Sequence, residues 1–322
     1  MFLDEIVITI KSGRGGRGCE SYIRRADRKM IPNGGDGGSG GDVMIRSDGK
    51  TGSLFALKSK RIFEAEAGGF GMGKNRYGQT GRALVLNVPC GTNVYNRSDH
   101  LLLRDLVKPD DQVVAAKGGR GGYGNHAGRP ATAGEEGVSL ELLLSFSIIA
   151  DIFLVGLPNS GKTALLKALT GAHLESTDYP FATKAPRLGT YESTSGRFQI
   201  CELPSVYEHS AEGRGLGNSF LKHLKRAKLI AMVLDPLNSF APTLKEGYDI
   251  LMKAVTEFDA HYARIPRLVV INKMDIKEAK KKIRAKRIRF KDPHVAVSAL
   301  TKEGLVSFVR HARILIKNSE TL

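Results

Sequence analysis

The stretch "GLPNSGKT", residues 156–163, decides the fold of the second half of the chain. It fits the pattern Gly-x-x-x-x-Gly-Lys-[Ser/Thr], and it lies between an apolar run typical of a strand and the helix-like segment "KTALLKALTG". In such a loop the backbone N–H groups, together with the start of the helix, bind phosphate oxygens. The stretch therefore predicts a phosphate-binding loop at the carboxyl end of a strand.

The residue types in this loop indicate what each would contact. Gly161 keeps side-chain bulk away from the phosphates, Lys162 reaches the β- and γ-phosphates, and the Thr163 hydroxyl binds Mg²⁺. Lys162 is also a predicted catalytic residue. The predicted phosphate-binding set is Asn159, Ser160, Gly161, Lys162, Thr163 and Ala164.

From residue 148 onward, strand-like apolar runs alternate with amphipathic helical segments. The predicted strands are 148–156, 187–193, 197–203, 229–235, 266–273 and 294–299. The predicted helices are 162–171, 218–227, 243–263 and 305–318. This alternation is typical of a doubly wound α/β domain with a mostly parallel sheet, which binds its ligands at the carboxyl ends of the strands.

A base-reading loop is predicted at "NKMD", residues 272–275, where the fifth of these strands ends. Asp275 can accept hydrogen bonds from N1–H and the exocyclic N2–H₂ of guanine, a donor pair that adenine lacks. Lys273 can lay its aliphatic stem along the base, and Asn272 would tie this loop to its neighbour. The motif argues against a P-loop kinase or ATPase and favours a guanine nucleotide.

Two further segments complete the predicted site. "SAL", residues 298–300, closes the last strand, and there Ser298 and the backbone N–H of Ala299 are predicted to lie at the base, the N–H on guanine O6. "STDYPFATKAP", residues 176–186, follows the first helix of this domain. Thr183 in it is the predicted second Mg²⁺ ligand, γ-phosphate sensor and catalytic residue.

The segment "ELPSV", residues 202–206, departs from what a GTPase usually carries, which is Asp-x-x-Gly. Glu202 keeps the charge of the Asp that holds a Mg²⁺-bound water, but it adds a methylene. Ser205 keeps a backbone N–H, yet a positive φ becomes costly for it. Both are predicted nucleotide contacts. A shift of about 1 Å can cost roughly 10²-fold in rate, so the sequence predicts GTP binding with slow hydrolysis.

Glycine marks the first half of the chain. Of the 37 glycines, 27 lie in residues 1–137, in clusters that alternate with strand-like segments. The predicted strands are 5–10, 42–47, 82–89 and 111–117. Because polyproline-II segments pack side by side only where side chains are missing, the clusters predict an ordered domain over 1–147, followed by the nucleotide domain over 148–322.

Nearly the whole chain resembles the Obg family of ribosome-associated GTPases. The resemblance is carried by "PNGGDGGSGGDV", "VPCGTNVY" and "GGRGGYGN" in the first half, and by "IADIFLVGLPNSGKTALL", "DYPFATKAPRLGTY" and "GRGLGNSFLKHLKRA" in the second. It implies a domain of polyproline-II helices on a small β-barrel, followed by a P-loop GTPase domain. It further implies a factor that binds the large ribosomal subunit during maturation under control of GTP or GDP.

The sequence departs from that family in residues that matter for turnover. The family pattern Asp-x-Pro-Gly is Glu202-Leu203-Pro204-Ser205 here, and its first switch I threonine is Ala182. Val206 is unremarkable within the family, although other GTPases place a water-orienting glutamine there. Two hypotheses stay open: a slow GTPase that assists ribosome assembly, and an assembly scaffold that holds GTP without cleaving it or does not need it.

The chain is strongly basic, with a formal net charge of +16, which favours an anionic partner. The run "KEAKKKIRAKRIRFK", residues 277–291, follows the base-reading loop, and arginines flank the glycine clusters. The residues predicted to contact rRNA phosphates are Arg14, Arg17, Arg24, Arg25, Lys281, Lys282, Arg284, Lys286 and Arg287. Recognition by RNA shape and phosphate, without base sequence, is expected.

Composition indicates an intracellular protein. Three scattered cysteines imply neither a disulfide framework nor a metal site, and the N-terminus "MFLDEIVITI" has no basic n-region. The most apolar stretch, residues 140–157, is interrupted by Glu141 and Asp151, so we expect strands there and no membrane span. A soluble monomer in a bacterial-type cytoplasm is expected, with a mitochondrial or plastid matrix as the alternative.

Overall fold

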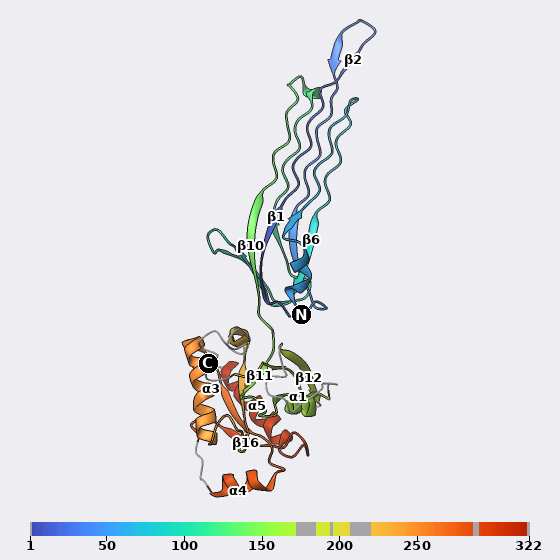
Figure 1. The fold of residues 1–322 in the computed structure, drawn as a ribbon. Helices are drawn as coiled ribbons and strands as arrows, with labels where there is room; N and C mark the ends of the chain where they lie inside the picture. Colours follow the sequence, from blue (N-terminus) through green and yellow to red (C-terminus); the bar gives the residue numbers. More distant parts are fainter. Residues whose placement is uncertain (1, 172–184, 194–195, 207–219, 286–289, 321–322) are drawn as a thin grey trace. The chain divides into compact units, whose positions relative to one another are not determined.

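The structure is a computed structural model. It describes residues 2–171, 185–193, 196–206, 220–285 and 290–320. The chain folds into two compact units, Met1–Ser147 and Ile148–Leu322. The first unit holds β1 to β10 and the second holds β11 to β16 (Figure 1).

Two sheets form the β part of the first unit. The larger one, in spatial order, consists of β5 (Ile62–Glu64), β1 (Glu5–Lys11), β10 (Ser139–Phe146), β7 (Thr92–Asn96) and β8 (Leu102–Leu106). The smaller one consists of β6 (Leu84–Pro89), β4 (Val43–Asp48) and β9 (Gln112–Ala116). Alternate apolar residues such as Ile8, Ile10 and Leu142 point into the buried core. Because β8 and β9 lie in contact, the edges of the two sheets meet, as expected for the predicted barrel.

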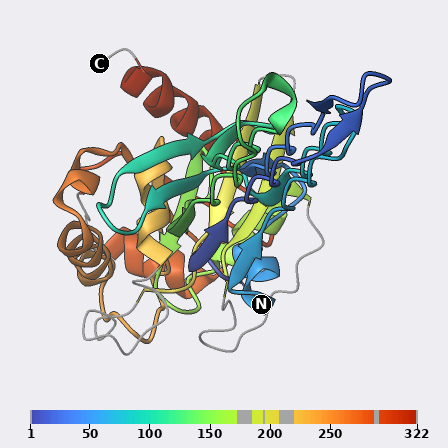
Figure 2. The same cartoon turned by 90° about the horizontal axis from the view of Figure 1, so that it is seen from above.

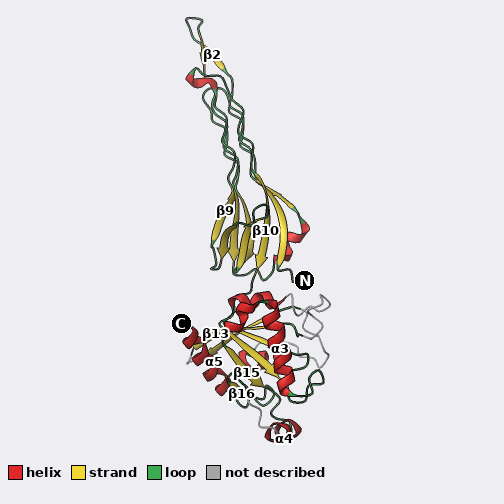
Figure 3. Ribbon diagram, turned by 90° about the vertical axis from the view of Figure 1, so that its left-hand side faces the viewer, coloured by secondary structure: helices red, strands yellow, loops and turns green. Residues whose placement is uncertain are grey.

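Three short elements accompany these sheets. The 3₁₀ helix η1 (Leu54–Ser59) packs against β1. The hairpin of β2 (Tyr22–Arg24) and β3 (Met30–Pro32) extends from the glycine-rich segments, next to the 3₁₀ helix η2 (Asn125–Ala127) (Figure 3).

The glycine-rich segments run side by side as extended chains outside the sheets (Figures 1 and 2). Their hydrogen bonds recur every third residue, as in Gly13 N to Gly41 O (2.9 Å) and Gly16 N to Gly38 O (2.8 Å). Three residues per turn is the repeat of polyproline II, so the predicted bundle is confirmed. Glycine is needed because the chains touch: a Cβ on Gly16 would lie 1.9 Å from the carbonyl oxygen of Gly69.

The second unit is a three-layered α/β domain built on a six-stranded sheet. In spatial order the strands are β12 (Arg187–Ser193), β13 (Gly196–Glu202), β11 (Ile152–Gly156), β14 (Leu229–Leu234), β15 (Arg267–Ile271) and β16 (His294–Ala296). Among these described strands only the β12–β13 pair is antiparallel, so the predicted mostly parallel sheet is confirmed. α1 (Lys162–Thr170) and α5 (Leu305–Glu320) share one core cluster, while α3 (Leu244–Phe258) lies on the other side of the strands (Figure 3).

Two predicted helices differ in the structure. The helix predicted over 243–263 ends at Phe258, because Asp259 takes an extended conformation and its carboxylate accepts a hydrogen bond from His261 N at 2.8 Å. A separate 3₁₀ helix, η5 (Ala260–Arg264), follows. The end of the helix predicted over 218–227 is the 3₁₀ helix η4 (Lys222–Arg226), tightened by the bond from Ala227 N to Leu224 O.

Candidate functional site

The glycine-containing loop turns sharply between β11 and α1. Gly161, directly before α1, has a φ of 86°, and Asn159 has a φ of 58°. A Cβ on Gly161 would lie 2.2 Å from the side-chain nitrogen of Asn272. Glycine is therefore needed at position 161, because a side chain there would collide with Asn272. The backbone N–H groups of the first helical turn, including those of Thr163 and Ala164, follow directly after it.

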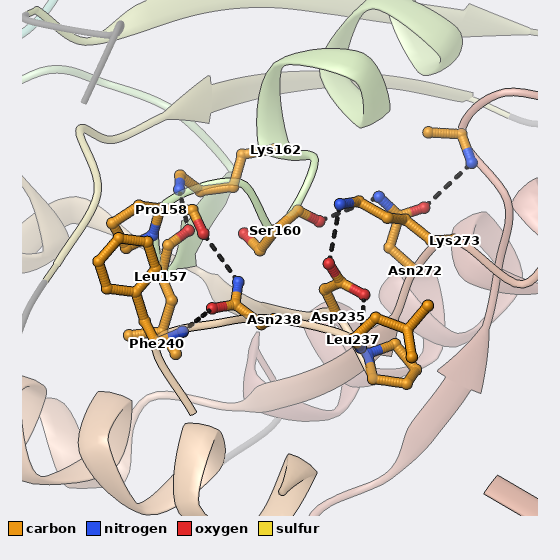
Figure 4. A network of polar contacts seen from close by, with 12 residues as sticks. Leu157, Pro158, Ser160, Lys162, Asp235, Leu237, Asn238, Phe240, Asn272 and Lys273 are labelled. Carbon is orange, nitrogen blue, oxygen red and sulfur yellow. Dashed lines mark hydrogen bonds and ion pairs between the residues drawn. The ribbon is translucent and has the colours of Figure 1, made fainter. Parts of the chain in front are cut away.

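Lys162 is buried, with 4% of its surface exposed. Its Nζ donates three hydrogen bonds of 2.9 Å each, to Gly156 O, Leu157 O and the Ser205 hydroxyl (Figure 4 shows this lysine above the loop). Burial lowers the pKa of Lys162 to about 8, an effect that the negative charge of Glu202 partly opposes. The lysine is thus held by two carbonyl groups of the loop on one side and by the Ser205 hydroxyl on the other.

Thr163 and Glu202 meet directly beside this lysine. Thr163 Oγ1 donates a hydrogen bond of 2.6 Å to Glu202 Oε1, and the Glu202 side chain ends β13 with 1% exposure. A hydroxyl and a carboxylate are oxygen ligands that suit Mg²⁺. Among the described residues no cluster of three or more His, Cys, Asp or Glu could hold a metal alone, so Mg²⁺ here would also need phosphate oxygens or water.

Three other predictions concern the switch segments. Ser205 does not have a positive φ, so the strain considered for a serine at this place does not arise. Val206 is fully buried and its N–H reaches Gly156 O at 3.3 Å. Thr183, the predicted γ-phosphate sensor, lies outside the described residues.

Asn272 joins the phosphate loop to the loop after β16. Its Nδ2 donates to Ser160 O at 3.1 Å, and its Oδ1 accepts from Ala299 N at 3.1 Å (Figure 4). Asp275 lies at the same edge, where its Oδ1 accepts a 2.6 Å hydrogen bond from the buried Ser298 hydroxyl. The predicted phosphate-binding and base-reading loops are therefore brought together by one amide side chain.

Two residues of the site were missed by the sequence analysis, Asp235 and Asn238, which follow β14. Asp235 forms a 2.8 Å ion pair with Lys273, whose backbone has a φ of 61° (Figure 4). Asn238 donates from Nδ2 to Pro158 O at 2.8 Å. The signal that could have found them is their place: polar residues at the carboxyl end of a central strand meet the neighbouring strand ends.

The predicted RNA-contacting residues differ in their exposure and in the part of the fold on which they lie. Arg14, Arg17, Arg24 and Arg25 are exposed in the first unit. On α4 (Lys277–Ala285), four cationic side chains line an open hollow of about 550 Å³. These are Lys277, Lys280, Lys281 and Arg284.

Not every predicted cation on α4 faces outward. Lys282 Nζ donates to Pro236 O at 2.7 Å and Pro242 O at 3.1 Å, so this lysine anchors α4 to the domain. Lys286 and Arg287 lie outside the described residues. None of the described helices has the length and apolar character that a membrane crossing requires.

Comparisons with known proteins identify related sequences over most of the chain. The family model described as GTP1/OBG matches residues 3–144, and the one described as 50S ribosome-binding GTPase matches residues 151–273. The GTPase Obg of Desulfatibacillum aliphaticivorans is 38% identical over 288 residues, with 86% of each chain covered. The GTPase Obg of Persephonella marina is 35% identical over 322 residues, covering 96% of this chain and 95% of that protein. Among solved structures, the FeoB G-domain from Methanococcus jannaschii is 21% identical with a TM-score of 0.38, covering 52% of this chain and 97% of that one.

Proposed function

This chain belongs to the Obg family of GTPases, and from that premise we propose that it is a GTP-binding factor of the large ribosomal subunit that assists late assembly and hydrolyses GTP slowly. The observation that carries the proposal is the double hydrogen bond of Asn272, which couples the phosphate loop to the base-reading loop. A single nucleotide can then span both loops.

We assign the phosphates of GTP to the backbone N–H groups from Asn159 to Ala164 and to Lys162. Asp275, oriented by Ser298, would read the guanine edge, with Lys273 along the base. The Ala299 N–H donates to Asn272 Oδ1 in this structure, so it would have to turn from that oxygen to reach guanine O6. Thr163 and Thr183 would hold Mg²⁺, with Glu202 on a Mg²⁺-bound water, and the ion when bound neutralises phosphate charge.

The proposed slow hydrolysis is supported by residues at the end of β13 and directly after it. Val206 is buried and unremarkable within the family, so the proposal rests on Glu202 and Ser205. Glu202 is longer than aspartate and already contacts Thr163 Oγ1 directly. A displacement of about 1 Å in a catalytic site can cost roughly 10²-fold in rate, so we expect the longer side chain to slow cleavage.

The ribosome part of the proposal is supported by family membership, by the description of the matching family model and by charge. Arg14 and Arg17 lie exposed between buried glycines of the first unit, and four cations line the α4 hollow. Both surfaces suit RNA phosphates, which attract Lys and Arg without reading base sequence. We propose a bacterial-type cytoplasm as the site of action, with an organelle matrix as the alternative.

The test measures two things on the full chain with Mg²⁺: the affinities for GTP, GDP and ATP, and single-turnover cleavage of GTP with and without large ribosomal subunits. We expect guanine-specific binding, slow cleavage and co-sedimentation with the subunits that weakens as salt rises. Equal affinity for ATP would contradict the site assignment. Guanine-specific binding with no cleavage in either condition would favour the non-hydrolysing scaffold.

Restoring the usual switch residues should raise turnover. In the double variant Glu202→Asp, Ser205→Gly the shorter carboxylate and the free glycine peptide recover the usual geometry, so we expect single-turnover cleavage to rise roughly 10²-fold. Rapid-quench measurement of labelled GTP checks this, with each single variant as a control. Unchanged cleavage in a double variant that still binds GTP would show that the cause of slow hydrolysis lies elsewhere.

A further inference from the structure

The segment 202–206 is hydrogen-bonded to β11 by its backbone and to the phosphate loop by side chains. Leu203 N donates to Leu154 O at 3.1 Å and Val206 N donates to Gly156 O at 3.3 Å. The Leu203 and Val206 side chains are fully buried. The segment therefore extends β13 alongside β11, and this docking places the Ser205 hydroxyl 2.9 Å from Lys162 Nζ.

The hydrogen bonds of Lys162 use its whole donor capacity. A lysine ammonium has three N–H donors, and all three are directed at protein oxygens. Two of the acceptors, Gly156 O and Leu157 O, belong to the phosphate loop itself. The third belongs to Ser205, on the neighbouring segment. With only 4% of Lys162 exposed, little solvent is available to substitute for any of them.

A phosphate oxygen that reaches Nζ must therefore replace one of these acceptors. The two carbonyls are fixed by the turn that forms the loop, whereas the Ser205 contact joins two separate segments and is the one that can be exchanged. A glycine at position 205 has no side chain with which to make this contact.

We propose that the Ser205 hydroxyl is an internal competitor of the nucleotide phosphates for Lys162, which lowers nucleotide affinity and releases segment 203–206 when phosphate binds. The inference rests on the proposed GTP site. Ser205 acts through Lys162 and is a positioning residue. When a phosphate oxygen replaces the Ser205 hydroxyl on Lys162, binding at the phosphate loop is coupled to movement of segment 203–206.

The test compares Ser205→Ala with Ser205→Thr in the full chain, stripped of nucleotide. Removing the hydroxyl should tighten binding of labelled GDP and GTP roughly tenfold, because a hydrogen bond to a charged group no longer has to be broken. Ser205→Thr keeps a hydroxyl and should bind like the unaltered protein. Hydrogen exchange adds a second readout: the amides of Leu203 and Val206 should exchange faster on nucleotide addition in the unaltered protein, and already without nucleotide in Ser205→Ala.

The opposite sign of the affinity change would overturn the inference. Weaker binding by Ser205→Ala would mean that the hydroxyl is a phosphate ligand. Equal binding by all three proteins, with equal exchange at Leu203 and Val206, would mean that the contact has no role, while leaving the GTP site intact. If the unaltered protein binds no guanine nucleotide, the proposed function fails together with this inference.

Discussion

Replacing Gly40 with alanine is expected to disrupt the glycine-rich bundle. A Cβ at this position would lie 1.9 Å from Gly13 O, a backbone atom that cannot rotate away. Moving the chains apart breaks bonds such as Gly40 N to Gly119 O at 2.9 Å. Overpacking costs about 1–3 kcal/mol and each lost hydrogen bond about 1 kcal/mol more, so a loss of about 3–6 kcal/mol in unfolding free energy is expected. Calorimetry of the full chain should show the first unit unfolding at a much lower temperature.

Gly52→Ala is the matched control. A Cβ on Gly52 would meet no atom within 4 Å, and its backbone does not need a positive φ. Its unfolding free energy should stay within about 0.5 kcal/mol of the unaltered protein. GTP affinity should survive in both variants, because the nucleotide site lies in the other unit. If Gly40→Ala were as harmless as the control, the close packing of the segments would be wrong.

Asp275→Asn is expected to change which base the protein selects. In the proposed site the carboxylate accepts from both N1–H and N2–H₂ of guanine, and an amide would place a donor against the second of these groups. Loss of two charge-assisted hydrogen bonds, with a polar clash added, should weaken GTP binding on the order of 10³-fold. Xanthosine triphosphate carries a carbonyl in place of the amino group, so its affinity should rise. Competition binding against a labelled guanine nucleotide measures both.

Binding of xanthosine triphosphate separates a change in base selection from damage to the fold, since a misfolded variant would bind neither nucleotide. Ser298→Ala gives a graded comparison, because the Ser298 hydroxyl orients Asp275 through a 2.6 Å hydrogen bond and also accepts one from Thr301 N at 3.0 Å. We expect a loss of about tenfold there, with guanine preference kept. Equal affinities of Asp275→Asn and the unaltered protein for GTP would remove Asp275 from the base site.

Much of the fold could be predicted because its signals are local. The apolar runs of the second half became β11 to β16, and period-two alternation located β1, β4, β6 and β9. Glycine clusters predicted side-by-side extended chains, since no other residue permits the approach seen at Gly16. The break at Asp259 was missed because a capping carboxylate there overrides helical periodicity.

The site was predictable where a motif fixes a residue's position in the chain, and not where bonds cross between segments. Lys162 and Asp275 stand in motifs with a known mechanism. Asn238 and Asp235 carry no such motif, and their partners Pro158 and Lys273 are distant in sequence. The bond between Lys162 and Ser205 likewise depends on how β13 continues beside β11, which only the folded chain reveals.

The bundle described in the first unit also has a thermodynamic consequence. Its interior consists of peptide groups, so its unfolding exposes mainly polar surface. Apolar exposure raises the heat capacity by about 0.45 cal/K/mol/Å², whereas polar exposure lowers it by about 0.26. The stability of the bundle should therefore change almost linearly with temperature, without the curvature that burial of apolar cores produces. Cooling weakens hydrophobic burial, whereas it lowers the entropic cost of ordering the glycine-rich chains, so we expect the bundle to gain stability in the cold.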